Sequence, residues 1–213
     1  MDARTPGSES FANLRRLVQT RPSKTERCEL CAVEISHDHT HLLQTGTSAI
    51  VCSCPSCAIL FGDRKEAKYR RIPREVRSLN GFLLTDAQWD SLAIPINLAF
   101  FCHLGDASVP AAFYPSPAGA TQSLLDLQSW EQIVKQNPAL RKLRPDVECL
   151  LASRFAEPHE YYVVPVDECF RLVGLIRSNW RGFSGGKEAW QAIGGFFAAL
   201  KAKATPLDVG AHA

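Results

Sequence analysis

Two Cys-x-x-Cys pairs are the residues of this sequence whose type and spacing best suit chemistry. Cys28 and Cys31 form the first pair, and Cys54 and Cys57 form the second after an interval of 22 residues. A Cys-x-x-Cys turn points two thiolates at one ion, so two such turns supply tetrahedral sulfur coordination. Zn²⁺ accepts this geometry, and so does iron. The pattern predicts one metal ion held by these four cysteines, and scattered reduced thiols are the weaker interpretation.

The identity of the ion is less constrained than its ligands. Zinc is the usual ion in four-cysteine sites of this kind. The Cys-Pro-x-Cys form of the second pair also occurs in rubredoxins, which keeps iron as the alternative. Rubredoxins carry a glycine after each pair, whereas Ala32 and Ala58 stand in those positions here. We therefore expect zinc and retain iron as the second choice.

A fifth thiol and three histidines lie between the two pairs. Cys52 could replace Cys54 as a ligand, cap the site, act as a redox thiol or simply be a small apolar residue. His37, His39 and His41 alternate, so an extended strand would project all three to one face. They could be ligands, hydrogen-bond donors to a thiolate or a transient site for nickel or iron. Polar residues on the exposed face of a hairpin are the alternative.

The elements that must position these residues divide the chain into five segments. Between the pairs, His41-Leu-Leu and Ala49-Ile-Val read as strands around a turn at Thr45-Gly46-Thr47. The segments are a tail with a short helix (1–27), the cysteine-rich ribbon (28–61), a basic linker (62–80), an α+β body (81–205) and a C-terminal tail (206–213).

The body carries alternating helix and strand signals. We expect an α+β fold with an antiparallel sheet covered on one face by helices, and a zinc-ribbon or rubredoxin-like unit at its N-terminal side. Gly194-Gly195 lies inside the last helix, which predicts close packing of another element there. The expected elements are a helix capped at Thr85, strands over 94–103 and 111–114, a loop from Pro115, a helix capped at Ser129, a hairpin over 147–164, and helices after Pro165 and after Ser184-Gly-Gly.

Composition limits the class of protein. The chain has 213 residues, 46% hydrophobic and 22% charged, with a net charge of +2 and eight cysteines, as expected for a globular domain. The first twenty residues have no apolar core typical of a secretory signal. No apolar run reaches the roughly 18 residues that span a membrane. We therefore expect a reducing cytoplasm, where clustered cysteines indicate metal or redox chemistry.

No recognised catalytic motif is present, so we expect a non-enzymatic protein. Strand alternation sends Cys102 and His103 to opposite faces, which disfavours a Cys–His nucleophile. Cys149 and Cys169 lie in apolar runs and are predicted as core residues. The segment from Arg64 to Arg77 holds seven basic and two acidic residues. Nucleic-acid binding through it is an alternative, but Tyr69 is its only aromatic residue and the total charge is low.

A series of motifs runs along most of the chain. It comprises the cysteine pairs, His39-x-His41-Leu-Leu, Cys52-x-Cys-x-x-Cys57-Ala-x-Leu-Phe61, Tyr114-Pro-Ser-Pro-Ala-Gly119, Asp146-Val-Glu-Cys-Leu-Leu151, Tyr161-Tyr-Val-Val-Pro-Val-Asp-Glu-Cys169 and Trp180-Arg-Gly-Phe-Ser-Gly-Gly186. With these motifs the chain resembles an uncharacterised bacterial family whose members, notably in actinobacteria, are encoded beside genes of nickel–iron uptake hydrogenases. The resemblance implies a setting rather than an activity: an accessory role in assembling, or in exchanging electrons with, a hydrogenase, and a hydrogenase subunit or maturation factor as protein partner.

Overall fold

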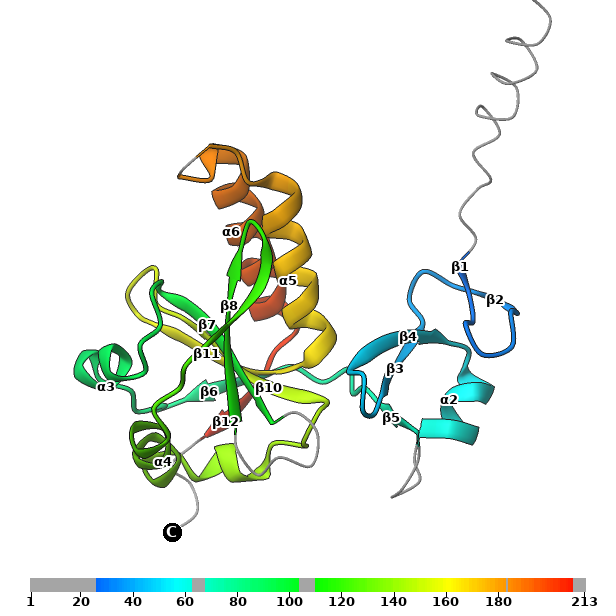
Figure 1. The fold of residues 1–213 in the computed structure, drawn as a ribbon, viewed down its shortest axis with the longest axis horizontal. Helices are drawn as coiled ribbons and strands as arrows, with labels where there is room; N and C mark the ends of the chain where they lie inside the picture. Colours follow the sequence, from blue (N-terminus) through cyan, green and yellow to red (C-terminus); the bar gives the residue numbers. More distant parts are fainter. Residues whose placement is uncertain (1–25, 63–67, 104–109, 183, 209–213) are drawn as a thin grey trace, which may run out of the picture.

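The structure is a computed structural model that describes residues 26–62, 68–103, 110–182 and 184–208. The short helix expected within residues 1–27 lies almost wholly outside these ranges. No helix in the described ranges combines the length and the apolar composition that crossing a bilayer would need. The chain is α+β, with a small N-terminal unit beside a larger body (Figure 1).

The N-terminal unit is built on the predicted hairpin. β3 (Thr40–Gln44) and β4 (Ala49–Ser53) pair antiparallel, and β5 (Tyr69–Arg71) adds to β3 to give a three-stranded sheet. Two short strands, β1 (Glu26–Arg27) and β2 (Glu34–Ile35), form a separate pair. Helix α2 (Pro55–Gly62) follows β4 directly. The two cysteine pairs therefore lie at the β1–β2 turn and at the β4–α2 junction.

The body contains a seven-stranded mixed sheet; among the strands in the described ranges, β12 and β6 pair in parallel and the others pair antiparallel. The predicted hairpin over 147–164 is present as β10 and β11. In spatial order the strands are β12 (Thr205–Asp208), β6 (Arg77–Asn80), β11 (Glu160–Pro165), β10 (Glu148–Ser153), β7 (Leu98–His103), β8 (Pro110–Ser116) and β9 (Gly119–Ser123).

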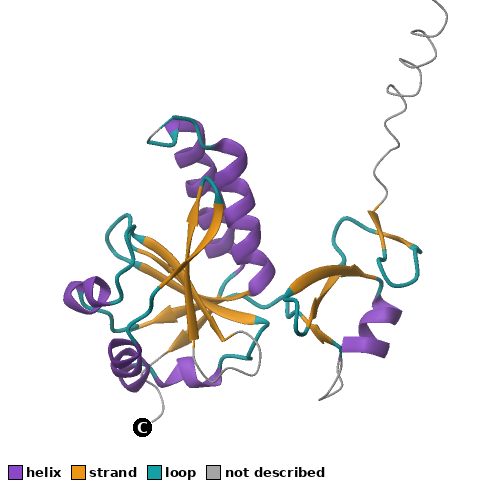
Figure 2. Cartoon of the chain, in the orientation of Figure 1, coloured by secondary structure: helices purple, strands orange, loops and turns teal. Residues whose placement is uncertain are grey.

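Helices cover both faces of this sheet, so the expectation of helices on one face is wrong (Figures 1 and 2). Phe100 and Leu151 pack with α5 (Val166–Asn179) and α6 (Gly186–Lys203). Their neighbours Phe101 and Leu150 pack with α3 (Asp86–Ser91), α4 (Leu127–Gln136) and the 3₁₀ turn Pro138–Lys142. The physical reason is that β7 and β10 are apolar at successive positions, and a strand that is apolar on both faces needs a cover on each.

The boundaries of two body elements differ from prediction for local reasons, whereas a third element keeps its predicted cap. Thr85 caps α3 through a capping box with Gln88, as predicted. Helix α4 begins earlier than predicted, because Asp126 accepts the N–H groups of Gln128 and Ser129 and is the capping residue. The loop predicted from Pro115 is a hairpin, since β8 continues to Ser116 and turns into β9.

The segment 62–80 is not a plain linker. It supplies β5 to the small sheet and β6 to the large sheet, so its strands connect the two units. The C-terminal segment 206–213 also departs from a tail, because β12 extends to Asp208 in the large sheet. Backbone hydrogen bonds explain both differences: β5 and β12 pair at the edges of their sheets, and β6 pairs between β12 and β11. The polar composition of these segments hides such pairing from sequence patterns.

Two further expectations about the core need correction. Cys149 is buried as predicted, but it is joined to the buried Cys102 by a disulfide, because the β7–β10 register places the two directly opposite. Disulfides are rare in a reducing cytoplasm, so the compartment stays a prediction. The Gly194-Gly195 pair does not mark close packing, because a Cβ built at either glycine meets no atom within 4 Å.

Candidate metal centre

The first cysteine pair is held by a tight turn between β1 and β2. The N–H of Ala32 donates to the carbonyl of Cys28 at 2.7 Å, and the N–H of Cys28 donates to the carbonyl of Val33 at 2.9 Å. Ala32 has φ +62°, the left-handed conformation that glycine adopts most easily. The backbone therefore makes the turn that a glycine would favour, although the sequence supplies an alanine.

The second cysteine pair is held by the start of a helix. Pro55 occupies the first position of α2, where a missing N–H is harmless and the fixed φ suits the helix. The N–H of Ala58 donates to the carbonyl of Cys54 at 2.9 Å, so Ala58 is an ordinary helical residue. The N–H of Cys57 also donates to Cys54 Sγ at 3.4 Å, which supports a thiolate at that position.

The four sulfur atoms meet at one point. All four lie within 4.8 Å of one another, and Cys31 Sγ is 3.7 Å from Cys54 Sγ. A metal–sulfur distance of about 2.3 Å in a tetrahedral site gives sulfur–sulfur edges of about 3.8 Å. The donor set and its spacing thus fit a tetrahedral ion, and iron and zinc fit equally well by this distance.

The charge requirements of the cluster also call for a cation. Burial alone raises the pKa of Cys28, but hydrogen bonds from the backbone of Cys54, Leu30 and Cys31 lower that pKa to about 6. Burial and contacts with the other cysteine side chains raise the pKa of Cys57 to about 12. One thiolate in this cluster therefore suppresses the ionisation of its neighbours. Four thiolates are compatible here only around a positive ion.

The structure thus brings together the four cysteines that the spacing singled out. Cys28, Cys54 and Cys57 are buried, whereas Cys31 is exposed, so one edge of the cluster faces solvent. Cys52 is not part of this group. The binding of an ion itself stays a prediction of the sulfur geometry.

Cys52 belongs instead to a second group, with His39 and His41. One ligand atom from each residue lies within 4.8 Å of the others. The β3–β4 register places His41 and Cys52 directly opposite one another. His37 is left out, because its side chain is fully exposed. Of the three alternating histidines, two therefore share a site with a thiol.

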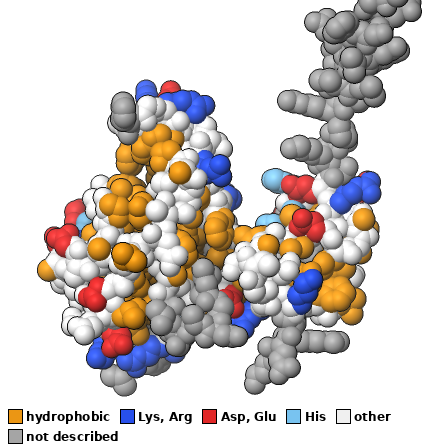
Figure 3. Space-filling model, viewed as in Figure 1, with side chains coloured by type: hydrophobic (Ala, Val, Ile, Leu, Met, Phe, Trp, Pro, Cys, Tyr) orange, Lys and Arg blue, Asp and Glu red, His pale blue; other side chains and the backbone are white. Residues whose placement is uncertain are grey.

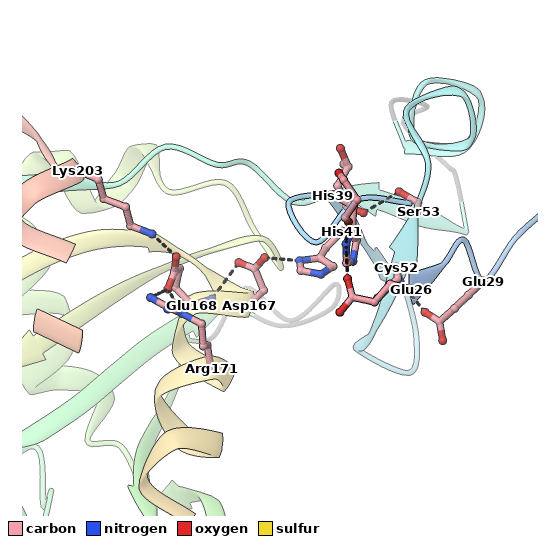
Figure 4. A network of polar contacts seen from close by, with 12 residues as sticks. Glu26, Glu29, His39, His41, Cys52, Ser53, Asp167, Glu168, Arg171 and Lys203 are labelled. Carbon is pink, nitrogen blue, oxygen red and sulfur yellow. Dashed lines mark hydrogen bonds and ion pairs between the residues drawn. The ribbon is translucent and has the colours of Figure 1, made fainter. Parts of the chain in front are cut away.

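Two acidic neighbours of this second group escaped sequence reasoning. Asp167, in the first turn of α5, lies 2.7 Å from His41 Nδ1, and Glu26 Oε2 lies 3.1 Å from His39 Nδ1 (Figure 4). Burial, followed by the charges of Glu29 and Glu26, raises the pKa of the Cys52 thiol. No local pattern connects residues 41 and 167, so only the folded chain could identify this contact.

Comparison with known proteins places most of this chain in one family. Residues 27–204 match a family described as a family of unknown function, DUF5947. The matched span includes both groups of metal-ligating side chains and ends just before β12. Searches of curated proteins and of solved structures gave no significant match. By the extent of the match, the chain belongs to the DUF5947 family.

Proposed function

We propose that this chain is a non-enzymatic metal-binding accessory protein whose four-cysteine centre holds one structural Zn²⁺ ion. The observation that carries the proposal is the convergence of Cys28, Cys31, Cys54 and Cys57 at tetrahedral spacing. Their local core contains little else, since only Leu30 and Ile35 pack against it and both are only partly buried. A bound ion supplies folding energy where apolar burial is small.

The test is metal content measured on the full chain purified without added metal. We expect at least one tightly held zinc equivalent, and Cys31→Ser should lose the zinc of the four-cysteine centre. Cys169→Ala is the matched control, because Cys169 is a free buried thiol in the body, outside both ligand groups. Retention of the full zinc content by Cys31→Ser would contradict the ligand assignment.

A rubredoxin-like electron carrier is the second candidate, and one observation favours it. Rubredoxins carry a glycine where Ala32 stands, but Ala32 adopts the left-handed backbone conformation that glycine favours. The missing glycine therefore counts less against iron. The helical start of α2 at the second pair argues for zinc, because Ala58 needs no such conformation. A sulfur-ligated ferric ion absorbs strongly in the visible, whereas zinc is colourless, so the spectrum of the purified protein separates the two.

Nucleic-acid binding through the basic segment gains no support. Arg70, Arg74 and Arg77 each lie 3.2 Å or less from a carboxylate oxygen of this chain, on Asp146, Asp38 and Glu148 respectively. Arginines committed to intramolecular ion pairs are not free to neutralise phosphates. The absence of salt-dependent binding to generic DNA or RNA would exclude this alternative.

A protein partner fits the surface better. Three large apolar side chains of α2 are exposed, namely Ile59 at 66%, Leu60 at 58% and Phe61 at 45%, and hydrophobic side chains gather over this helix (Figure 3). Adjacent exposed apolar residues of this kind mark interaction sites. We take the partner to be a hydrogenase subunit or maturation factor, on the strength of the sequence resemblance alone.

Affinity capture tests this partner. The tagged full chain should retain the hydrogenase subunit or maturation factor encoded nearby, and Ile59→Ser with Leu60→Ser should lose it. Leu124→Ser is the control, because Leu124 is 94% exposed but lies in the body, between β9 and α4. Equal capture by the α2 variant and the wild type would remove α2 as the docking surface.

A further inference from the structure

The ring of His39 is buried with one nitrogen unused. Its side chain is only 6% exposed. His39 Nδ1 lies 2.9 Å from the carbonyl oxygen of Ser36, which can only accept, so Nδ1 carries the proton. In the neutral ring Nε2 then has a free lone pair, and this atom is buried without a hydrogen-bond partner. A buried nitrogen acceptor without a partner is costly, which calls for a ligand that the protein itself does not supply.

The ring of His41 is oriented in a similar way. Its Nδ1 lies 2.7 Å from Asp167 Oδ2, and the carboxylate accepts the ring proton. Nε2 is therefore the nitrogen left to act as a ligand. A carboxylate that holds the far nitrogen of a histidine is the usual support of a metal-bound imidazole, because it fixes the tautomer and raises ligand basicity. In Figure 4 Asp167 and His41 point toward one another from α5 and β3.

Cys52 completes the group from the neighbouring strand. Its N–H donates to Glu29 Oε2 at 2.6 Å, which holds the backbone of β4 at this residue. Glu26 adds a second carboxylate, whose buried Oε2 lies 3.1 Å from His39 Nδ1. Carboxylates therefore flank the group itself, with Asp167 on one side and Glu26 and Glu29 on the other, whereas Arg74, Arg171 and Lys203 line the adjoining cavity. This charge pattern favours a cation at the centre.

From this arrangement we propose that His39, His41 and Cys52 form a second metal site, which takes a divalent transition ion of borderline softness such as Zn²⁺, Co²⁺ or Ni²⁺. Two imidazoles and one thiolate suit ions of this class. The proposal goes beyond the structural role of the four-cysteine centre. Three protein ligands leave a coordination position open, as in sites that bind water or an exchangeable ligand.

The surroundings of the open position support exchange. A cavity of about 470 Å³ is lined by both histidines together with Asp167, Glu168 and Arg171. It lies where the N-terminal unit meets α5, so the proposed ion has ligands from one unit and a supporting carboxylate from the other. An ion with access to such a cavity can be loaded and released, whereas three of the four cysteines of the first centre are buried.

Cobalt titration of the full chain loaded with a single zinc equivalent, which fills the four-cysteine centre and leaves the second site free, tests the second site. A thiolate bound to Co²⁺ gives a charge-transfer absorption, so the site reports its own occupancy. We expect one saturable Co²⁺ equivalent in the wild type, no thiolate band from this site in Cys52→Ala, and at least tenfold weaker binding in His41→Gln. His37→Gln is the matched control, because His37 is on the same segment but fully exposed, and it should titrate like the wild type.

Asp167→Asn keeps the test decisive if a ligand variant misfolds, since Asp167 is outside the N-terminal unit. Loss of a carboxylate behind a ligand typically weakens metal binding by about 10–100-fold. Identical titrations of Cys52→Ala and the wild type, or no saturable band in the wild type, would overturn the second site. Failure of the four-cysteine centre is a separate result, namely a purified chain without tightly held zinc.

Discussion

Removal of the structural ion should disorder the first turn of the N-terminal unit and spare the large sheet. About ten residues from Glu26 to Ile35 form β1, the first cysteine turn and β2. Ordering their backbone costs on the order of 10–20 kcal/mol, at about 1–2 kcal/mol per residue. Cys28 and the partly buried Leu30 and Ile35 contribute less than about 8 kcal/mol, at roughly 1.5–3 kcal/mol per buried side chain.

The shortfall is therefore at least about 2–12 kcal/mol, which the ~10–16 kcal/mol contributed by a structural zinc would offset. Hydrogen exchange read by mass spectrometry, before and after treatment with a zinc chelator, measures the consequence. Peptides covering 26–36 should lose protection entirely, whereas peptides covering β10 and β11 should keep theirs because those strands are buried between helices. Unchanged protection of 26–36 in the metal-free chain would refute the reasoning.

Three further predictions concern stability. Glu148 is buried, and its carboxylate lies 2.6 Å from Arg77 and 2.9 Å from Arg144. Glu148→Gln should therefore lower the free energy of unfolding, measured in urea, by about 3 kcal/mol. Glu131→Gln, at an exposed position, is the control and should leave this free energy unchanged. Burial opposes ionisation, but Arg144 and Arg77 hold the pKa of Glu148 below its usual range. The carboxylate therefore stabilises the fold at pH values above its unfolded-state pKa. The difference in unfolding free energy between wild type and Glu148→Gln should shrink as the pH falls below about 4. Ala32→Gly should raise the stability of the metal-loaded chain by about 0.5–1 kcal/mol, because the left-handed backbone suits glycine. Ala58→Gly should lower it by about 1 kcal/mol, because Ala58 is inside α2. Thermal unfolding of both variants measures these two opposite changes in stability. Thr85→Ala removes the cap of α3 and should cost about 1 kcal/mol with an unchanged urea m-value.

Local chemistry explains what could be predicted. The cysteine pairs, the β3–β4 hairpin, the capped helix α3 and the β10–β11 hairpin each depend on residues close in sequence. The double apolar face of β7 was also readable, since Leu98-Ala-Phe-Phe-Cys102 is an unbroken apolar run and predicts cover on both sides. The one-sided sheet was thus an error of interpretation rather than a missing signal.

Distant pairings could not be read in the same way. The Cys102–Cys149 disulfide spans 47 residues and depends on the β7–β10 register. The contact of His41 with Asp167 spans 126 residues and depends on how α5 approaches β3. Strand order and register are set by the whole core, and a one-residue slip would reverse every side chain. The acidic neighbours of the second group were therefore hidden from the sequence, although its three candidate ligands were not.

The two ligand groups are physically joined, and the connection sets an order of assembly. Glu29 lies inside the first cysteine turn, and its N–H donates to the carbonyl of Cys52 at 2.9 Å while its carboxylate accepts the N–H of Cys52 at 2.6 Å. Ordering of the first turn by the four-cysteine centre would therefore position Cys52 opposite His41. The reverse does not hold, because none of the four cysteines of the first centre is a ligand in the second group. Zinc in the first centre should consequently survive loss of Cys52, whereas loss of Cys31 should abolish metal binding at both positions.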